Sequence, residues 1–342
     1  MQFSNRYTIS FILLALLLVI CFFVNISLGS ISIPNKVIFN SIFGTIDNTS
    51  WQHIIVDYRL PKAFTAIIVG SGLGISGLMM QTLFRNPLAG PFVLGITSGA
   101  SLGVAMVTMG ASLFGGVLVG ILASKWSLVI AATLGSFLVL LTVLIVSTKV
   151  RDAMAILIIG LMFGSISAAV VNVLSYFSSA EELQQYFFWG FGSLGNLSWN
   201  ELLILFILYL MGILLSLTAI KPLNSLLLGE NYAKSLGLNI KQSRLLIIIS
   251  TSLLAGTITA FAGPIAFIGL AIPHITRQVF STSNHKILLP AVFLFGAIIM
   301  LICDSIAQLP SSDYTLPINA ITSLIGAPVV IWLLVRKRKM MF

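Results

Sequence analysis

The chain has 342 residues, of which 58% are hydrophobic and 8% are charged, and its mean hydropathy is +1.08. Soluble domains carry about 25% charged residues, so this composition excludes a water-soluble protein and indicates a membrane protein. We attribute the net charge of +9 to basic residues that set the membrane topology and contact anionic lipid, rather than to a nucleic-acid site.

Ten stretches are apolar enough to cross a bilayer, which needs about 20 mostly apolar residues per helix. The first follows Arg6 but is too long for a typical signal peptide and lacks an A-x-A-like cleavage site, so we expect an uncleaved helix. Residues 1–342 are therefore expected to form a single all-α transmembrane domain. The spans are 8–28, 62–82, 94–110, 127–147, 153–177, 199–219, 243–261, 265–280 (broken), 288–307 and 318–335.

Two connections on the predicted outer side are long. Residues 29–61 include Trp51 and Tyr58, and residues 178–198 include an acidic pair followed by an aromatic cluster at 186–189. Either connection can offer a docking surface to an extracytoplasmic partner. Their aromatic residues can equally be anchors at the membrane interface, so both interpretations stay open.

The third span carries glycine at every fourth position, at Gly95, Gly99 and Gly103. Such a stripe shares one helix face and lets two helix backbones approach closely in lipid. We expect it to be a packing surface, either static or sliding. The turn that precedes it, residues 85–91, contains arginine, asparagine and two prolines, which resist burial in a regular helix.

Positive charge is distributed unequally between the two sides of the membrane. With the N-terminus inside, 14 of the 18 Lys and Arg residues fall on the inner side, and only Lys36, Arg59, Lys62 and Lys125 fall outside. Because basic residues mark the cytoplasmic side, both termini are expected in the cytoplasm.

The longest cytoplasmic connection, residues 220–242, is predicted to form two short amphipathic helices at about 222–238. Pro222 and Asn224 can begin the first helix, Gly229 can interrupt the pair, and Gly237 can end the second. Their leucine and tyrosine side chains can be buried against a partner or lie on the lipid interface.

Chemistry-bearing residues are few. The sequence contains no G-x-x-x-x-G-K-[ST] motif for binding ATP, and its three histidines are scattered without a metal-ligand pattern. Catalytic residues, a metal site and a bound cofactor are therefore not expected on this chain. Asp304 is the only acidic residue in the last four spans. We expect it to reach the nearby water interface or to cap its neighbours.

Four ordered motifs resemble the FecCD-type permease family, the membrane subunits of bacterial ATP-driven importers for iron-siderophores, haem or cobalamin. They are residues 59–103, Gly229-Glu230…Ala233…Leu236-Gly237, Ala262-Gly-Pro-Ile-Ala-Phe-Ile-Gly-Leu-Ala-Ile-Pro-His274 and Leu324-Ile-Gly-Ala-Pro328. The resemblance implies a type II ABC importer permease fold with pseudo-symmetric halves. Ala89-Gly-Pro91 recurs as Ala262-Gly-Pro264, a weak internal echo that suits such halves.

The resemblance also implies partners. A second permease copy, in a homodimer or with a sister chain, would enclose the path; two ATPase subunits would hold ATP and Mg²⁺. A periplasmic or lipid-anchored binding protein would deliver a chelate, with ferric siderophore first, then haem and cobalamin. The location implied is the bacterial cytoplasmic membrane. The alternatives are an ion-coupled secondary transporter and, more remotely, an intramembrane enzyme.

Residue roles are carried over where motifs match. ATPase coupling would use Gly229 to Gly237, with Glu230 and Tyr232 facing the partner and Leu236 packing the two short helices beside Ala233. The inner gate would include Asn86 and Leu88, with Met154 as a less securely aligned member. Arg59 and Lys62 would meet the binding protein. Gln308 stands where the family commonly has arginine, and the family's usual Glu-x-Pro-x-Gly is altered to Thr315-Leu-Pro-Ile-Asn319.

Overall fold

The computed structural model describes residues 5–29, 31, 33–42, 49–110, 124–150, 153–308 and 314–335, and every regular element within these ranges is a helix. Two sets of residues used to predict topology, Arg151 and the basic tail at 336–339, lie outside these ranges. The elements are α1 (Asn5–Ser27), α2 (Asn35–Ile42), α3 (Thr49–His53), the π-helix η1 (Ile54–Arg59), α4 (Leu60–Leu83), the 3₁₀ turn η2 (Pro91–Leu94), α5 (Ile96–Thr108), α7 (Lys125–Lys149), α8 (Ala153–Phe177), α9 (Ala180–Gly190), α10 (Trp199–Thr218), α11 (Ile220–Leu226), α12 (Glu230–Ser235), α13 (Ile240–Ala262), α14 (Ile268–Phe280), α15 (His285–Ala307) and α16 (Ile318–Val335).

Each of the ten predicted spans contains one helix, which confirms the all-α polytopic fold. Among the described residues, seven helices are long and apolar enough to cross a membrane, and α5 and most of α16 are shorter apolar helices. The broken span at 265–280 is confirmed, because an extended segment at 263–267 precedes the 13-residue α14.

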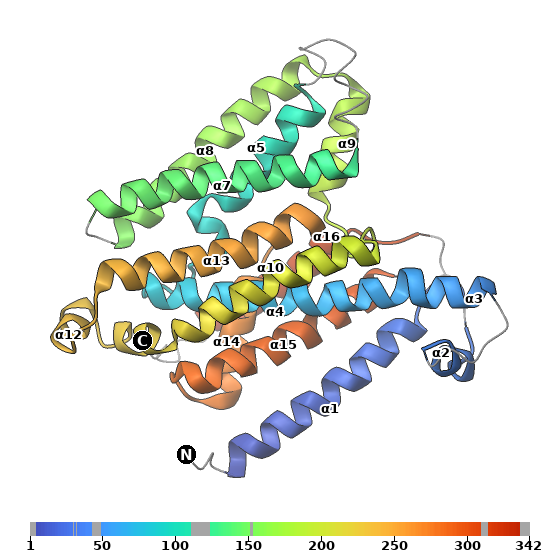
Figure 1. The fold of residues 1–342 in the computed structure, drawn as a ribbon, viewed down its shortest axis with the longest axis horizontal. Coiled ribbons are helices and arrows are strands. Elements are labelled where there is room, and N and C mark those ends of the chain that lie inside the picture. Colours follow the sequence, from blue (N-terminus) through green and yellow to red (C-terminus); the bar gives the residue numbers. More distant parts are fainter. Residues whose placement is uncertain are drawn as a thin grey trace.

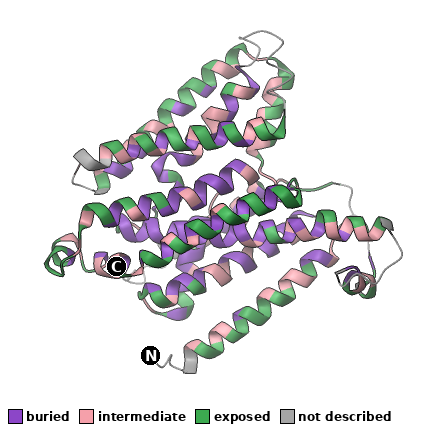
Figure 2. Cartoon of the chain, in the orientation of Figure 1, coloured by how far each residue is buried: buried purple, intermediate pink, exposed green. Residues whose placement is uncertain are grey.

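The helices form a bundle with α4 at its centre (Figure 1). Helices α10, α13, α14 and α15 pack around α4, and α1 packs mainly on α15. Helices α5, α7, α8 and α9 form a second group at the top of the view in Figure 1, joined to the first mainly through α13. Buried residues concentrate in α4 and its neighbours, as Figure 2 shows.

Glycine allows α4 to lie this deep. A Cβ atom at Gly70 would lie 2.1 Å from the carbonyl oxygen of Gly296 on α15, and one at Gly77 would collide with the carbonyl oxygen of Gly269 on α14. The helices therefore touch backbone to backbone. Such contacts maximise van der Waals packing where lipid offers no hydrophobic drive between helices.

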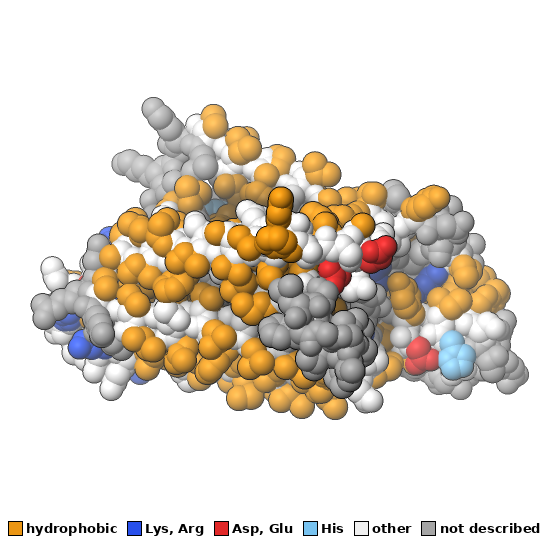
Figure 3. Space-filling model, turned by 90° about the horizontal axis from the view of Figure 1, so that it is seen from above, with side chains coloured by type: hydrophobic (Ala, Val, Ile, Leu, Met, Phe, Trp, Pro, Cys, Tyr) orange, Lys and Arg blue, Asp and Glu red, His pale blue; other side chains and the backbone are white. Residues whose placement is uncertain are grey.

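The bundle has two chemically different ends. The start of α1 and the hairpin α11–α12 lie at one end, the left in Figure 1. In Figure 3, Lys and Arg side chains gather at that end and hydrophobic side chains cover the middle of the face. We call it the basic end; α2, α3 and the segment joining α9 to α10 mark the opposite end.

Three details differ from what the sequence predicts. The connection 178–198 contains the helix α9, which begins with a capping box between Ser179 and Glu182. The connection 29–61 contains α2, and from Thr49 it runs through α3 and η1 directly into α4. Gly95 lies before α5 with φ +73°, as its left-handed cap, so the stripe on the helix itself consists of Gly99 and Gly103.

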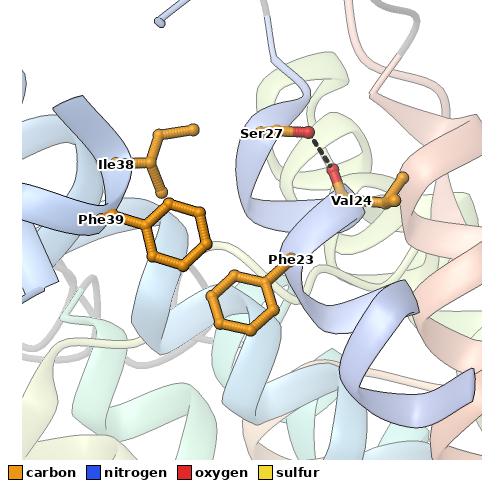
Figure 4. Close-up of a pocket in the computed structure, with 5 residues that line it drawn as sticks. All are labelled: Phe23, Val24, Ser27, Ile38 and Phe39. Atoms are coloured by element: carbon orange, nitrogen blue, oxygen red, sulfur yellow. Dashed lines mark hydrogen bonds between the residues drawn. The ribbon is translucent and has the colours of Figure 1, made fainter. Parts of the chain in front are cut away.

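A small hollow of about 160 Å³ lies between α1 and α2 at the opposite end. It is lined by Phe23, Val24, Ser27, Ile38 and Phe39 (Figure 4). The rings of Phe23 and Phe39 stack with their centroids 5.1 Å apart. Among the described residues its lining is apolar except for Ser27, whose hydroxyl donates to the Val24 carbonyl, and the contact of the two rings fixes α2 on α1.

Candidate functional site

The hairpin α11–α12 projects from the basic end and has the form that its sequence predicts. Gly229 (φ +100°) separates the two helices and Gly237 (φ +80°) ends the second, backbone conformations that other residues rarely adopt. Leu223, Leu226 and Ala233 are buried and hold the hairpin on the bundle.

Three large apolar side chains of the hairpin are exposed on its surface. Leu228, Tyr232 and Leu236 are 62%, 54% and 59% exposed. The resemblance implied that Leu236 packs the two helices together, but the exposure of Leu236 contradicts this; the fully buried residue of α12 is Ala233. An apolar cluster on a short polar connection is typical of a protein-binding surface.

Glu230 is engaged within the chain. Its carboxylate lies 2.9 Å from the guanidinium of Arg244 at the start of α13, and Arg244 also donates to the carbonyl of Val150, after α7. The Glu230 side chain is 34% exposed, so one of its faces remains open to a partner. The pair ties α12 to α13 and to the end of α7.

The turn between α4 and η2 is built by Asn86. The Asn86 side chain accepts the backbone N–H of Leu88 (2.9 Å), and the Asn86 N–H donates to the carbonyl of Gln81 (3.1 Å). His274 on α14 lies 2.8 Å from the carbonyl of Pro87, which anchors the turn from the other side. Leu88 itself is 42% exposed at the basic end.

Met154, the other predicted gate residue, lies in the first turn of α8 and is 45% exposed. Helix α8 packs on η2, where a Cβ atom at Gly160 would lie 2.3 Å from the carbonyl oxygen of Val93. The structure therefore places Met154 on a helix that contacts the element after the Asn86 turn.

The glycine stripe faces α7. A Cβ atom at Gly99 would lie 2.5 Å from the carbonyl oxygen of Gly135, and one at Gly103 would lie 2.1 Å from that of Ala131. Gly95 instead faces Gly160 on α8. The stripe thus packs α5 on α7 within the same chain.

At the opposite end, the structure contradicts an exposed docking role for Arg59. The residue is 6% exposed, and its guanidinium donates to the carbonyls of Ile26 (2.9 Å), Ser27 (3.2 Å) and Ile31 (2.5 Å). Ile26 and Ser27 end α1, where helix carbonyls lack partners within the helix and the helix dipole is negative. Arg59 therefore caps α1.

Lys62 is also paired internally. Its ammonium lies 3.2 Å from the carboxylate of Asp304, with side-chain exposures of 12% and 2%. The Asp304 carboxylate also accepts from Asn25 (2.9 Å) and Gln308 (2.8 Å), so Gln308 serves this buried cluster in place of the arginine expected there. Of the two expectations for Asp304, reaching water is wrong, because the residue is 2% exposed, and its carboxylate instead binds these three neighbouring side chains.

A hollow of about 370 Å³ lies above this cluster. Lys62 and Asp304 form part of its wall, with aromatic residues from η1 and α9. The remaining wall belongs to the segments before α10 and α16. Its lining residues are Tyr58, Lys62, Phe188, Phe191, Gly192, Ser193, Leu194, Gly195, Asp304, Ala307, Thr315, Leu316, Pro317 and Ile318.

Asn319 is a site residue that the sequence did not single out as functional. Its side chain accepts a hydrogen bond from the Ala266 N–H (3.0 Å) and donates one to the carbonyl of Gly190 (3.4 Å). Asn319 thereby joins three parts of the chain beside the hollow: the end of α9, the segment that precedes α14, and α16 itself. The sequence signal for this role was the position of Asn319 in the altered Thr315–Asn319 motif.

Within the described ranges, no three His, Cys, Asp or Glu side chains come close enough to hold a metal ion.

Comparison with known proteins gives one consistent picture. The family model of the FecCD transport family matches residues 17–336. The hemin transport system permease protein HmuU of Yersinia pestis is 35% identical over 328 residues, covering 95% of each chain. The vitamin B12 import system permease protein BtuC of Klebsiella pneumoniae is 38% identical over 288 residues, covering 84% of each. A solved structure of a metal-chelate type ABC transporter in an inward-facing conformation superposes with a TM-score of 0.80 at 35% identity, covering 96% of this chain and 99% of that one.

Proposed function

This chain belongs to the FecCD transport family, and from that premise we propose how it works in its importer, with which partners and on which cargo. It is the membrane-spanning permease subunit of an ATP-binding-cassette importer for a metal chelate. The relatives are permeases of haem and vitamin B12 import systems, so an ion-coupled secondary transporter is no longer supported.

The proposed assembly contains two permease copies, two ATPase subunits and a periplasmic or lipid-anchored binding protein in the bacterial cytoplasmic membrane. ATP and Mg²⁺ belong to the ATPase subunits, since this sequence contains no P-loop motif. With the basic end in the cytoplasm, the hairpin α11–α12 faces the ATPases and the hollow above Lys62 faces the incoming chelate. Ferric siderophore is our first candidate cargo, and haem and cobalamin are the cargoes named for the relatives.

One observation carries the ATPase assignment. Leu228, Tyr232 and Leu236 are more than half exposed on a hairpin that is anchored to the bundle by the buried Leu223 and Leu226. Burial of apolar side chains in a partner would release this surface from water. A groove on an ATPase subunit is the partner that this position and chemistry suit.

The experiment uses the complete importer in proteoliposomes. Leu236→Asp should abolish ATP-driven chelate uptake and the stimulation of ATP hydrolysis by loaded binding protein, because it places charge in the apolar contact. Gln242→Asp is the matched control: it adds the same charge at an exposed position in the first turn of α13, where an acidic residue suits the helix dipole. Normal coupled uptake by Leu236→Asp would remove the hairpin from the ATPase interface.

The cargo is tested separately with the cognate binding protein. Titration with ferric siderophores, haem and cyanocobalamin should give one strong binder, and the same compound should be taken up by the proteoliposomes. Uptake that persists after ATP is depleted while ion gradients are held would contradict the importer mechanism itself.

A further inference from the structure

Three polar side chains from three different elements meet at the basic end, and two of them, Thr82 and His285, are buried. His285 is the first residue of α15 and is fully buried. Its ring lies 2.8 Å from the side-chain oxygen of Asn224 on α11 and 2.9 Å from the hydroxyl of Thr82 in the last turn of α4. We propose that His285 is a positioning residue that transmits movement of the ATPase-facing hairpin to α4 and its turn; this inference rests on the proposed function.

The hydrogen-bond pattern fixes the orientation of the Asn224 amide and of the His285 ring. The Asn224 side-chain oxygen accepts the His285 backbone N–H (2.9 Å), and its amide group donates to Asn284 (3.2 Å), so its orientation is fixed. Since that oxygen can only accept, the His285 Nδ1 must carry a proton and donate to it. The Thr82 hydroxyl lies 2.9 Å from His285 Nε2 and 2.8 Å from the carbonyl of Leu78, so its single proton can serve either acceptor.

This arrangement resists relative movement of its members. Apolar contacts can slide, whereas a directional hydrogen bond between buried groups is lost if either partner rotates away, and a buried polar group without a partner is costly. Asn224 holds His285 at two points, through its ring and its backbone. Helix α11 therefore moves together with the start of α15 and the end of α4.

The α4 end of this chain of contacts leads to the predicted gate. Thr82 is in the final turn of α4, and its neighbour Gln81 accepts the N–H of Asn86, the residue that builds the turn before Leu88. A displacement of the last turn of α4 thus shifts the backbone of Asn86 directly.

The other half of the hairpin is tied to different helices. Through Glu230 and Arg244, α12 is connected to α13 and to Val150 at the end of α7. The two halves of one hairpin therefore hold two groups of helices: α4 with α15, and α13 with α7. A rotation of the hairpin by the ATPases would change how these groups lie relative to each other at the basic end.

The test removes the link without changing side-chain volume much. Thr82→Val removes the hydroxyl that contacts His285, and Thr82→Ser, the matched control, keeps it. In proteoliposomes we expect Thr82→Val to raise the ATP hydrolysed per chelate transported about tenfold, the factor that corresponds to one lost hydrogen bond of buried groups. Thr82→Ser should keep the wild-type ratio.

A purely structural role gives different results. It would lower the amount of folded importer and reduce uptake and hydrolysis together, leaving their ratio at the wild-type value, and that result would overturn the proposal. Asn224→Leu breaks the same chain at its other end, so the double variant should be no more uncoupled than either single variant. Two additive losses would also count against a single chain of contacts.

Spin labels separate the link from the function. Label pairs at the exposed Lys234 of α12 and at Leu88, one per protomer, should both change distance when ATP binds to the otherwise wild-type importer. In Thr82→Val the change at Lys234 should remain and the change at Leu88 should be lost. If Thr82→Val and Asn224→Leu both fail to assemble, His285 serves folding and the proposal is rejected; if the wild type shows no ATP-driven uptake, the proposed function fails instead.

Discussion

Replacing Asp304 by leucine should strongly destabilise the permease, although the residue lies far from the basic end. The change keeps a side chain of similar volume but removes the shared acceptor of Lys62, Asn25 and Gln308, whose polar atoms lie 3.2, 2.9 and 2.8 Å from the carboxylate. These three donors come from α4, α1 and α15, so their loss loosens three helices together.

The magnitude follows from burial. Removing one partner of a buried ion pair costs about 3–5 kcal/mol, because the other charge stays buried and unpaired. Lys62 borders the hollow of about 370 Å³, where water can reach its ammonium, so we expect a value near the lower limit, about 3 kcal/mol. Lys62→Met in the Asp304→Leu background removes the orphaned charge and should restore about 2 kcal/mol of this loss.

The assay is unfolding by SDS in mixed micelles, followed by tryptophan fluorescence, for the wild type, both single variants and the double variant. The amides of Asn25 and Gln308 lose their acceptor with or without Lys62, so the double-mutant cycle reports the ion pair alone. A coupling free energy near zero would refute the reasoning and would show that Lys62 is hydrated independently of Asp304.

Three further outcomes are expected. Arg59→Leu should lower the free energy of unfolding while leaving the association rate of the binding protein with folded importer unchanged at low salt, as surface plasmon resonance can check; slower association would restore a docking role. Gly103→Leu should cost about 1–3 kcal/mol, because even its Cβ atom would meet the carbonyl oxygen of Ala131 at 2.1 Å, whereas Gly190→Ala, with nothing within 4 Å, should be nearly neutral in the same unfolding assay. Leu88→Cys should crosslink between protomers in one nucleotide state and not in another; equal crosslinking with and without ATP would mean that Leu88 is not a moving gate.

Hydropathy predicted the ten spans because the cost of placing polar residues in lipid acts on each segment separately. The hairpin α11–α12 could also be predicted from the sequence, since Pro222, Gly229 and Gly237 restrict or release the backbone at their own positions. Helix α9 was missed although its local signal was present: Ser179 and Glu182 form the capping box that begins it. The aromatic residues of this segment instead indicated anchors at the membrane interface.

The partners of the charged side chains could not be predicted from the sequence. Arg59 and Lys62 are basic residues on the predicted outer side, and only the folded bundle brings the end of α1 to Arg59 and Asp304 to Lys62. The same holds for His285, whose partner Thr82 lies 203 positions earlier in the chain. Composition determined that this protein crosses the membrane many times and where its chain turns, because solvation is a property of each segment. The tertiary structure alone decided which polar groups are buried together, because hydrogen bonds and ion pairs depend on distances between helices that are remote in sequence.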